Sequence, residues 1–138
     1  MTDTPDAAQL CGRVLRCFEE RSAQGIAALF APQALYELPF VPPGASATYR
    51  GPEEIERFLR MVLQRCLRTM AIIGPVITPV TPTLAFAEFR SEGETVAGDL
   101  YRNRYIVKAV SADGLLQQWA EYADPRPTDV LSTALAHR

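Results

Sequence analysis

A carboxylate and a tryptophan share one face of the last strand that the sequence predicts. In the segment LLQQWAEYADP, side chains alternate between two faces, so Trp119, Glu121 and Ala123 fall together. Burial beside an indole ring disfavours a charged carboxylate and raises its pKa toward the range useful to a general acid or base. Glu121 is therefore the first candidate catalytic residue. The alternative is a solvated or salt-bridged glutamate at a dimer contact.

Other polar residues on neighbouring strands could assist this carboxylate. Asn103 and Tyr105 share one face of the strand expected over 97–110. An asparagine can orient a ligand carbonyl or hold Glu121 in place, and a tyrosine can donate to an oxyanion, although both could simply pack in a core or interface. If Glu88 faces inward, it pairs with Glu121 and separates the two pKa values; otherwise it forms a cross-strand salt bridge.

Apolar residues at regular spacing are expected to form the wall of a pocket. The predicted strand over 34–40 and the predicted helix starting at Gly51 each present an apolar face. Together with residues of the later strands they give this expected ligand-binding wall: Tyr36, Leu38, Phe40, Phe58, Val62, Phe86 and Trp119.

The elements that must position these residues follow a simple order. Apolar periodicity predicts helices near the N-terminus, one strand, a long helix, and then several antiparallel strands, with a tight turn at Asp113-Gly114 and another at 92–94. This order is α+β, with helices on one face of a curved antiparallel sheet and a conical cavity on its concave side. We expect one domain over 1–138, with a core of about 8–126 and a short tail or helix over 127–138.

Composition narrows the classes of function. A net charge of −2 gives no reason to expect nucleic acid or a membrane surface as a partner. The three cysteines have no metal-binding spacing, and the acidic N-terminus is unlike a signal peptide, so a cytoplasmic location without metal is expected. The single histidine, His137, stands next to the C-terminus, which disfavours histidine-based catalysis, and no phosphate-binding glycine loop occurs. We predict no cofactor.

Three segments carry a resemblance to a known family: GIAALFAPQALYELPF, YRGPEEIERFL and NRYIVKAVSADGLLQQWAEYADP. The sequence resembles SnoaL-like proteins of the nuclear transport factor 2-like superfamily over roughly residues 8–126. That resemblance implies a cone-shaped α+β fold, a homodimer formed through the outer sheet face, and relatives that include ketosteroid isomerases, limonene epoxide hydrolases and polyketide cyclases.

The resemblance also tests individual chemistries. Where ketosteroid isomerases carry their aspartate base and their tyrosine donor, this chain has Leu38 and Val14, and residues 100–110 contain no carboxylate. Steroid isomerisation by that mechanism is therefore not expected. Limonene epoxide hydrolases carry one aspartate at the position of Glu121 and another near the position of Glu88. The arginine that they carry two residues before the latter is replaced here by Phe86. Phenazine-biosynthesis relatives carry a glutamate at the Glu121 position and an asparagine at the Asn103 position.

Two functional hypotheses follow. The first is a cofactor-independent acid–base enzyme acting on a small apolar, including polyketide-like, molecule as an isomerase, cyclase, dehydratase or hydrolase. The alternative is a non-catalytic module of the same fold that binds a small ligand or dimerises. A protein-interaction domain with a filled cavity is a third hypothesis.

Overall fold

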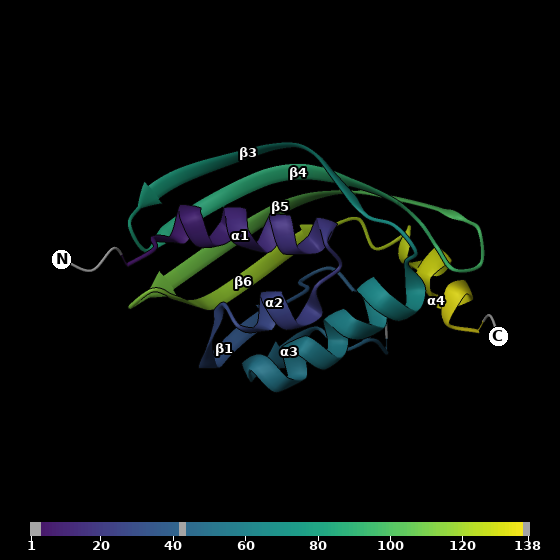
Figure 1. Ribbon diagram of the computed structural model, residues 1–138, viewed down its shortest axis with the longest axis horizontal. Coiled ribbons are helices and arrows are strands. Elements are labelled where there is room, and N and C mark those ends of the chain that lie inside the picture. Colours follow the sequence, from purple (N-terminus) through teal and green to yellow (C-terminus); the bar gives the residue numbers. More distant parts are fainter. Residues whose placement is uncertain (1–3, 42–43, 137–138) are drawn as a thin grey trace.

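The computed structural model describes residues 4–41 and 44–136, so the proline pair at 42–43 and His137 lie outside the described residues (Figure 1). The elements are, in chain order, α1 (Ala7–Glu19), α2 (Ala23–Ala27), β1 (Phe30–Glu37), β2 (Thr48–Arg50), α3 (Gly51–Arg60), the π-helical turn η1 (Met61–Cys66), β3 (Ala71–Thr81), β4 (Leu84–Glu94), β5 (Leu100–Ala112), β6 (Leu115–Ala123) and α4 (Thr128–Ala136).

The strands form one curved sheet in the order β2-β1-β6-β5-β4-β3. All neighbouring pairs are antiparallel except β1 and β6, which run parallel, so the sheet is mixed. Helices α1, α2 and α3 lie on the same side of this sheet, which arches over α1 (Figure 1). The α+β class with helices on one face of a curved sheet is confirmed, and the parallel pair is the feature that an all-antiparallel expectation missed.

Helix α1 begins at a strong local signal. The Asp6 side chain accepts from the backbone N–H of Gln9, and the Gln9 side chain accepts from the backbone N–H of Asp6, which satisfies two otherwise unpaired donors. From there Leu10, Val14 and Phe18 recur at helical spacing, and all three are buried against the sheet. The cap and the apolar stripe together fix one side of the core.

The two turns expected in the second half of the chain have different outcomes. Asp113 and Gly114 both adopt positive φ, 53° and 80°, and join β5 to β6 as predicted. The turn expected at 92–94 is wrong, because these residues continue β4 and the chain turns only after Thr95. Gly93 is there for close packing: a Cβ on it would lie 2.4 Å from the carbonyl oxygen of Thr69.

The end of the long helix widens into the turn η1. The Arg21 guanidinium donates to the carbonyl oxygens of Leu63 at 3.2 Å and Leu67 at 3.0 Å, which supplies donors where the wide turn leaves carbonyls unpaired. This contact fixes the segment that carries several cavity-facing side chains. Among the described residues, no helix is both long enough and apolar enough to span a bilayer.

Candidate functional site

A cavity of about 110 Å³ lies between the concave face of the sheet and the helices. Most of its lining is apolar and comes from α3, η1, α4 and the sheet. The polar groups gather on β1, β5 and β6. The lining residues are Phe18, Tyr36, Leu38, Phe40, Val41, Phe58, Leu59, Val62, Leu63, Leu67, Met70, Phe89, Tyr101, Asn103, Tyr105, Glu121, Ala123, Asp124, Pro125, Thr128 and Leu131.

Glu121 is held in this cavity by two donors that share one of its oxygens. The Tyr36 hydroxyl donates to Oε1 at 2.7 Å, and the Trp119 indole N–H donates to the same atom at 3.1 Å. Glu121 itself lines the cavity, and Oε2 is the carboxylate oxygen for which no donor is found among the described residues. One carboxylate oxygen is therefore fixed, and the other is available to a ligand.

Burial raises the pKa of the Glu121 carboxyl above its ordinary value of 4.5, and the hydrogen bonds from Tyr36 and Trp119 oppose that rise. The pKa of Tyr36 is held well above its usual value, first by burial and then by the nearby negative charge of Glu121. Tyr36 therefore stays protonated and remains a donor. A carboxyl whose pKa is shifted upward exchanges protons closer to neutral pH than an ordinary glutamate does.

A second cluster of polar side chains comes from β5 and β4, and its β5 members line the same cavity. The Tyr105 hydroxyl lies 2.8 Å from Ser91 Oγ and 3.1 Å from the Tyr101 hydroxyl, and the Asn103 amide donates to Tyr101 at 3.1 Å. The Asn103 amide also donates to the backbone carbonyl of Asp124 at 3.0 Å. These side chains form one connected hydrogen-bond chain, and all four are buried. Asn103 therefore orients Tyr101 rather than Glu121.

The raised pKa of Glu121 predicts a specific pH dependence of stability. Because the folded-state pKa lies above 4.5, the stability contributed by the protonated carboxyl is fully present below that pH and is lost as pH rises through the folded-state pKa. Glu121→Gln removes this titration. The free energy of unfolding of the wild type should therefore fall relative to that of the variant over this interval and level off above it. Urea unfolding at a series of pH values measures the difference, and a difference that does not change with pH would contradict the expectation.

Most of the residues expected around the pocket do line it. They are Tyr36, Leu38, Phe58, Val62, Asn103, Tyr105 and Glu121. Phe40 lies at the rim, where 58% of it is exposed.

Three expected placements are wrong. Glu88 and Phe86 lie on the outer face of β4, because the buried side chains of that strand are Ala85, Ala87 and Phe89. Glu88 therefore faces away from Glu121, and the pair of acids expected from the epoxide hydrolase resemblance does not assemble. Trp119 is fully buried but does not line the cavity; it acts on the site through its N–H bond to Glu121.

Sequence reasoning missed two members of the polar group, Tyr101 and Ser91. Alternation does place Tyr101 on the face of Asn103 and Tyr105, but spacing gave no sign that its hydroxyl joins them in one hydrogen-bond chain. Ser91 could not be placed from the sequence, because a turn was expected to begin at the next residue. In the structure β4 continues through this segment, and Ser91 lies opposite Asn103 of β5.

Neither a metal site nor a reactive thiol stands out in the part of the chain that the structure describes. No group of three or more histidine, cysteine, aspartate or glutamate side chains gathers there. The cysteines Cys11, Cys17 and Cys66 are free, and burial raises the pKa of the Cys11 thiol to about 12.

Comparison with known proteins supports the fold and leaves the activity open. No protein-family model matches the chain. An uncharacterized PhzA/B-like protein of Pseudomonas aeruginosa is 27% identical over 121 residues, which cover 87% of this chain and 85% of that protein.

Three solved structures show the likeness in three dimensions. A putative isomerase from Bacillus subtilis has a TM-score of 0.80 at 19% identity, with 97% of both chains covered. A Δ5-3-ketosteroid isomerase from Mycobacterium sp. has a TM-score of 0.75 at 16% identity, with 88% of this chain and 95% of that chain covered. A nuclear transport factor 2-like protein of unknown function from Burkholderia pseudomallei has a TM-score of 0.75 at 17% identity, with 96% and 99% covered.

The chain therefore has the nuclear transport factor 2-like fold, which it shares with ketosteroid isomerase. The resemblance to SnoaL-like proteins of that superfamily is confirmed at the level of the fold.

Proposed function

We propose that the protein is a cofactor-independent acid–base enzyme that moves a proton on a small apolar molecule. The observation that carries this proposal is Glu121: its side chain lines an apolar cavity, two donors fix one of its oxygens while the other has no donor among the described residues, and burial raises the carboxyl pKa. A positioned proton acceptor of this kind contributes typically about 10²–10⁴-fold to a reaction rate.

The proton transfer would run between carbon and Oε2 of Glu121. Oε2 takes a proton from a carbon next to a carbonyl, the electron pair of the C–H bond forms a C=C bond, and the π pair of the C=O bond moves onto the oxygen to give an enolate. The proton then returns from Oε2 to the same or another carbon as the C=O bond re-forms. The developing negative charge needs a donor, which the Tyr101–Tyr105 pair supplies. If Ser91 donates to Tyr105 and Tyr105 donates to Tyr101, the proton of Tyr101 is left to point at the ligand.

Cavity size limits the substrate. A dry cavity of about 150 Å³ accommodates benzene, whereas drug-sized ligands occupy about 300 Å³ or more. The cavity here, about 110 Å³, is smaller than the benzene-binding one, which limits the substrate to a molecule no larger than a single small ring. This favours isomerisation, dehydration or hydrolysis of a one-ring compound over cyclisation of a long polyketide-like chain.

The names of similar proteins agree with acid–base chemistry in this fold, since they include an isomerase and a putative polyketide cyclase. The alternative function is a non-catalytic module that binds a small ligand or dimerises. The observation that favours it is Leu38, which lines the cavity where the resemblance to ketosteroid isomerases places their aspartate base.

Hydrogen–deuterium exchange of cyclohexanone tests the proposal. This ketone has one small ring, a carbonyl acceptor and exchangeable hydrogens beside it. We expect the wild type to accelerate exchange of these hydrogens in D₂O, followed by proton NMR, above the rate in buffer. Binding is followed separately through the fluorescence of Trp119, the only tryptophan of the chain and a direct neighbour of Glu121. A fluorescence change without exchange would favour the binding module.

We also propose a homodimer and a cytoplasmic location. Large apolar side chains, among them Val76, Val80 and Phe86, are exposed on the outer side of β3 and β4 and would be covered by a second copy. The cytoplasmic location is supported by the three free cysteines, which a reducing compartment keeps unpaired.

A further inference from the structure

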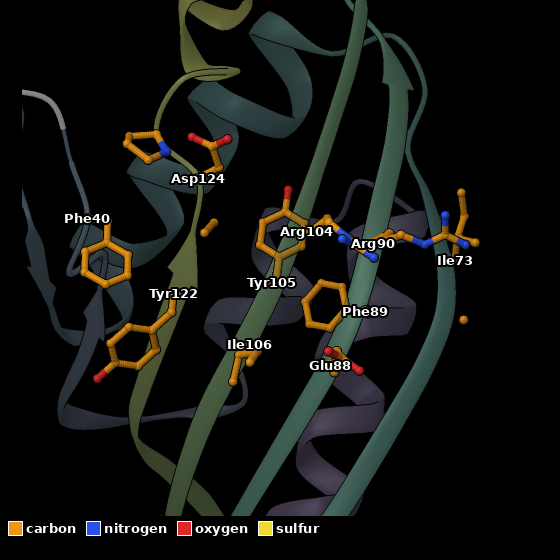
Figure 2. Close-up of a pocket in the computed structure, with 13 residues that line it drawn as sticks. Phe40, Ile73, Glu88, Phe89, Arg90, Arg104, Tyr105, Ile106, Tyr122 and Asp124 are labelled. Atoms are coloured by element: carbon orange, nitrogen blue, oxygen red, sulfur yellow. The ribbon is translucent and has the colours of Figure 1, made fainter.

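A second hollow opens on the outer face of the sheet, on the side away from the Glu121 carboxyl. It measures about 580 Å³, within the range of small-molecule sites. Figure 2 shows its composition: the rings of Phe40 and Tyr122 lie on one side, and Arg90 and Arg104 lie on the other. The proposed acid–base chemistry uses none of these four residues.

The two arginines stand directly opposite each other across β4 and β5. Like charges in that position are unfavourable unless an anion lies between them. The next row of the same face shows the usual solution, because Glu92 lies opposite Arg102 and the two form a salt bridge of 3.5 Å. Within the described residues, no carboxylate lies within salt-bridge distance of Arg90 or Arg104.

The nearest acid on the β6 side is already occupied. The last residue of β6, Ala123, pairs with Tyr105 of β5. Asp124 follows it and is therefore next to Arg104, the residue before Tyr105. Its carboxylate accepts from the Nε and Nη2 atoms of Arg126, at 3.0 Å and 2.7 Å, and Arg126 lowers the pKa of Asp124 by these bonds. The local carboxylate is thus paired with a third arginine, and the two guanidinium groups of the hollow keep their donors for another anion.

The rest of the hollow is suited to a flat ring. Phe40 and Tyr122 are both exposed and meet edge to face with ring centroids 5.7 Å apart, and Ile106 lies opposite Tyr122 with about half of its surface exposed. Glu88 is two residues from Arg90 along β4, a rise of about 6.8 Å, which is comparable to the length of one substituted benzene ring. Glu88 can accept a hydrogen bond from a donor at the far end of such a ring.

We propose that this hollow binds a small planar ring that carries a carboxylate at one end and a hydroxyl or amino donor at the other. The carboxylate lies between Arg90 and Arg104, which bind planar anions through paired N–H groups. The ring packs on Phe40, Tyr122 and Ile106. The donor at the far end points to Glu88. The hollow shares Phe40 with the rim of the first cavity, but Glu121 does not line it, and the proposed binding does not depend on the proposed activity.

Calorimetric titration with 4-hydroxybenzoate tests the proposal. We expect saturable binding by the wild type with a Kd of about 1 mM or tighter, which corresponds to about −4 kcal/mol. Arg90→Gln and Arg104→Gln should each weaken binding by about 10-fold or more, because each removes a charge-assisted hydrogen bond to the carboxylate. Glu88→Ala, which removes the acceptor, should weaken binding of 4-hydroxybenzoate more than binding of benzoate. The matched control is Arg102→Gln, an exposed arginine two residues along the same face, which should leave Kd unchanged.

Other outcomes would overturn the proposal. Absence of saturable binding by the wild type excludes the site. If Arg102→Gln weakens binding of 4-hydroxybenzoate as much as the other two variants do, the ligand responds only to the general positive charge of this face. If neutral benzyl alcohol binds as tightly as 4-hydroxybenzoate, the ligand binds only to apolar surface. If Arg90→Gln and Arg104→Gln instead convert a sedimenting dimer to a monomer and 4-hydroxybenzoate does not bind, the occupant of the hollow is a second copy of the chain.

Discussion

Replacing Glu121 with glutamine should slow the exchange of the cyclohexanone hydrogens by about 10²–10⁴-fold, the usual contribution of a positioned general base. Glutamine keeps the length of the side chain, and its carbonyl oxygen can still accept from Tyr36 and Trp119. It cannot take up a proton from carbon. Proton NMR of the exchange in D₂O gives the rate, and circular dichroism shows that the variant is folded.

A matched control separates this effect from the loss of any partly buried carboxylate. Glu37 on β1 accepts a hydrogen bond of 2.6 Å from Gln118 and does not line the cavity. Glu37→Gln should leave the exchange rate unchanged. If the Glu121→Gln variant is folded and exchanges the cyclohexanone hydrogens as fast as the wild type, the catalytic proposal is wrong and the binding function is left.

Local periodicity was sufficient for the part of the site that lies on one strand. Trp119 and Glu121 are two residues apart, so alternation alone placed them together, and their hydrogen bond confirms the prediction. The contact of Glu121 with Tyr36 could not be predicted this way. It joins residues 85 apart in sequence and depends on the parallel register of β1 and β6, which pairs Tyr36 with Trp119.

Alternation failed where both faces of a strand carry apolar residues. On β4 the two inward side chains that flank Phe86, Ala85 and Ala87, are small, whereas the outward Phe86 is large and 38% exposed. A large aromatic residue normally marks the buried face, so Phe86 was expected to point inward, and Glu88, on the same strand face, was a candidate to do so with it. An outer face that is itself partly apolar removes the contrast on which periodicity depends.

The misplaced turn at 92–94 has a related cause. A glycine between two glutamates is typical of a turn, because glycine accepts positive φ and charged residues favour solvent. Gly93 has no positive φ in the structure and serves instead to admit the backbone of Thr69 at close range. Sequence alone does not distinguish a glycine required for its φ from a glycine required for its missing Cβ.

Truncating Trp119 to alanine should lower the free energy of unfolding by about 3–5 kcal/mol, the range measured for large aromatic residues in a core. Trp119 is fully buried and lies with its ring centroid 6.4 Å from that of Tyr36 and 6.3 Å from that of Phe18. Alanine would leave a cavity behind the wall of the site. Urea unfolding followed by circular dichroism measures the loss, since the only tryptophan is removed.

Trp119→Phe separates packing from hydrogen bonding at the same position. Phenylalanine retains most of the ring contacts, so its loss of stability should be clearly smaller than that of alanine, but it removes the N–H donor to Glu121. Because that hydrogen bond lowers the pKa of Glu121 against the effect of burial, the pKa should rise further in this variant. Carbon-13 NMR of the Glu121 carboxyl measures the shift. An unchanged pKa would mean that Trp119 contributes to the site by packing alone, and Tyr36 would then be the residue that sets the protonation of Glu121.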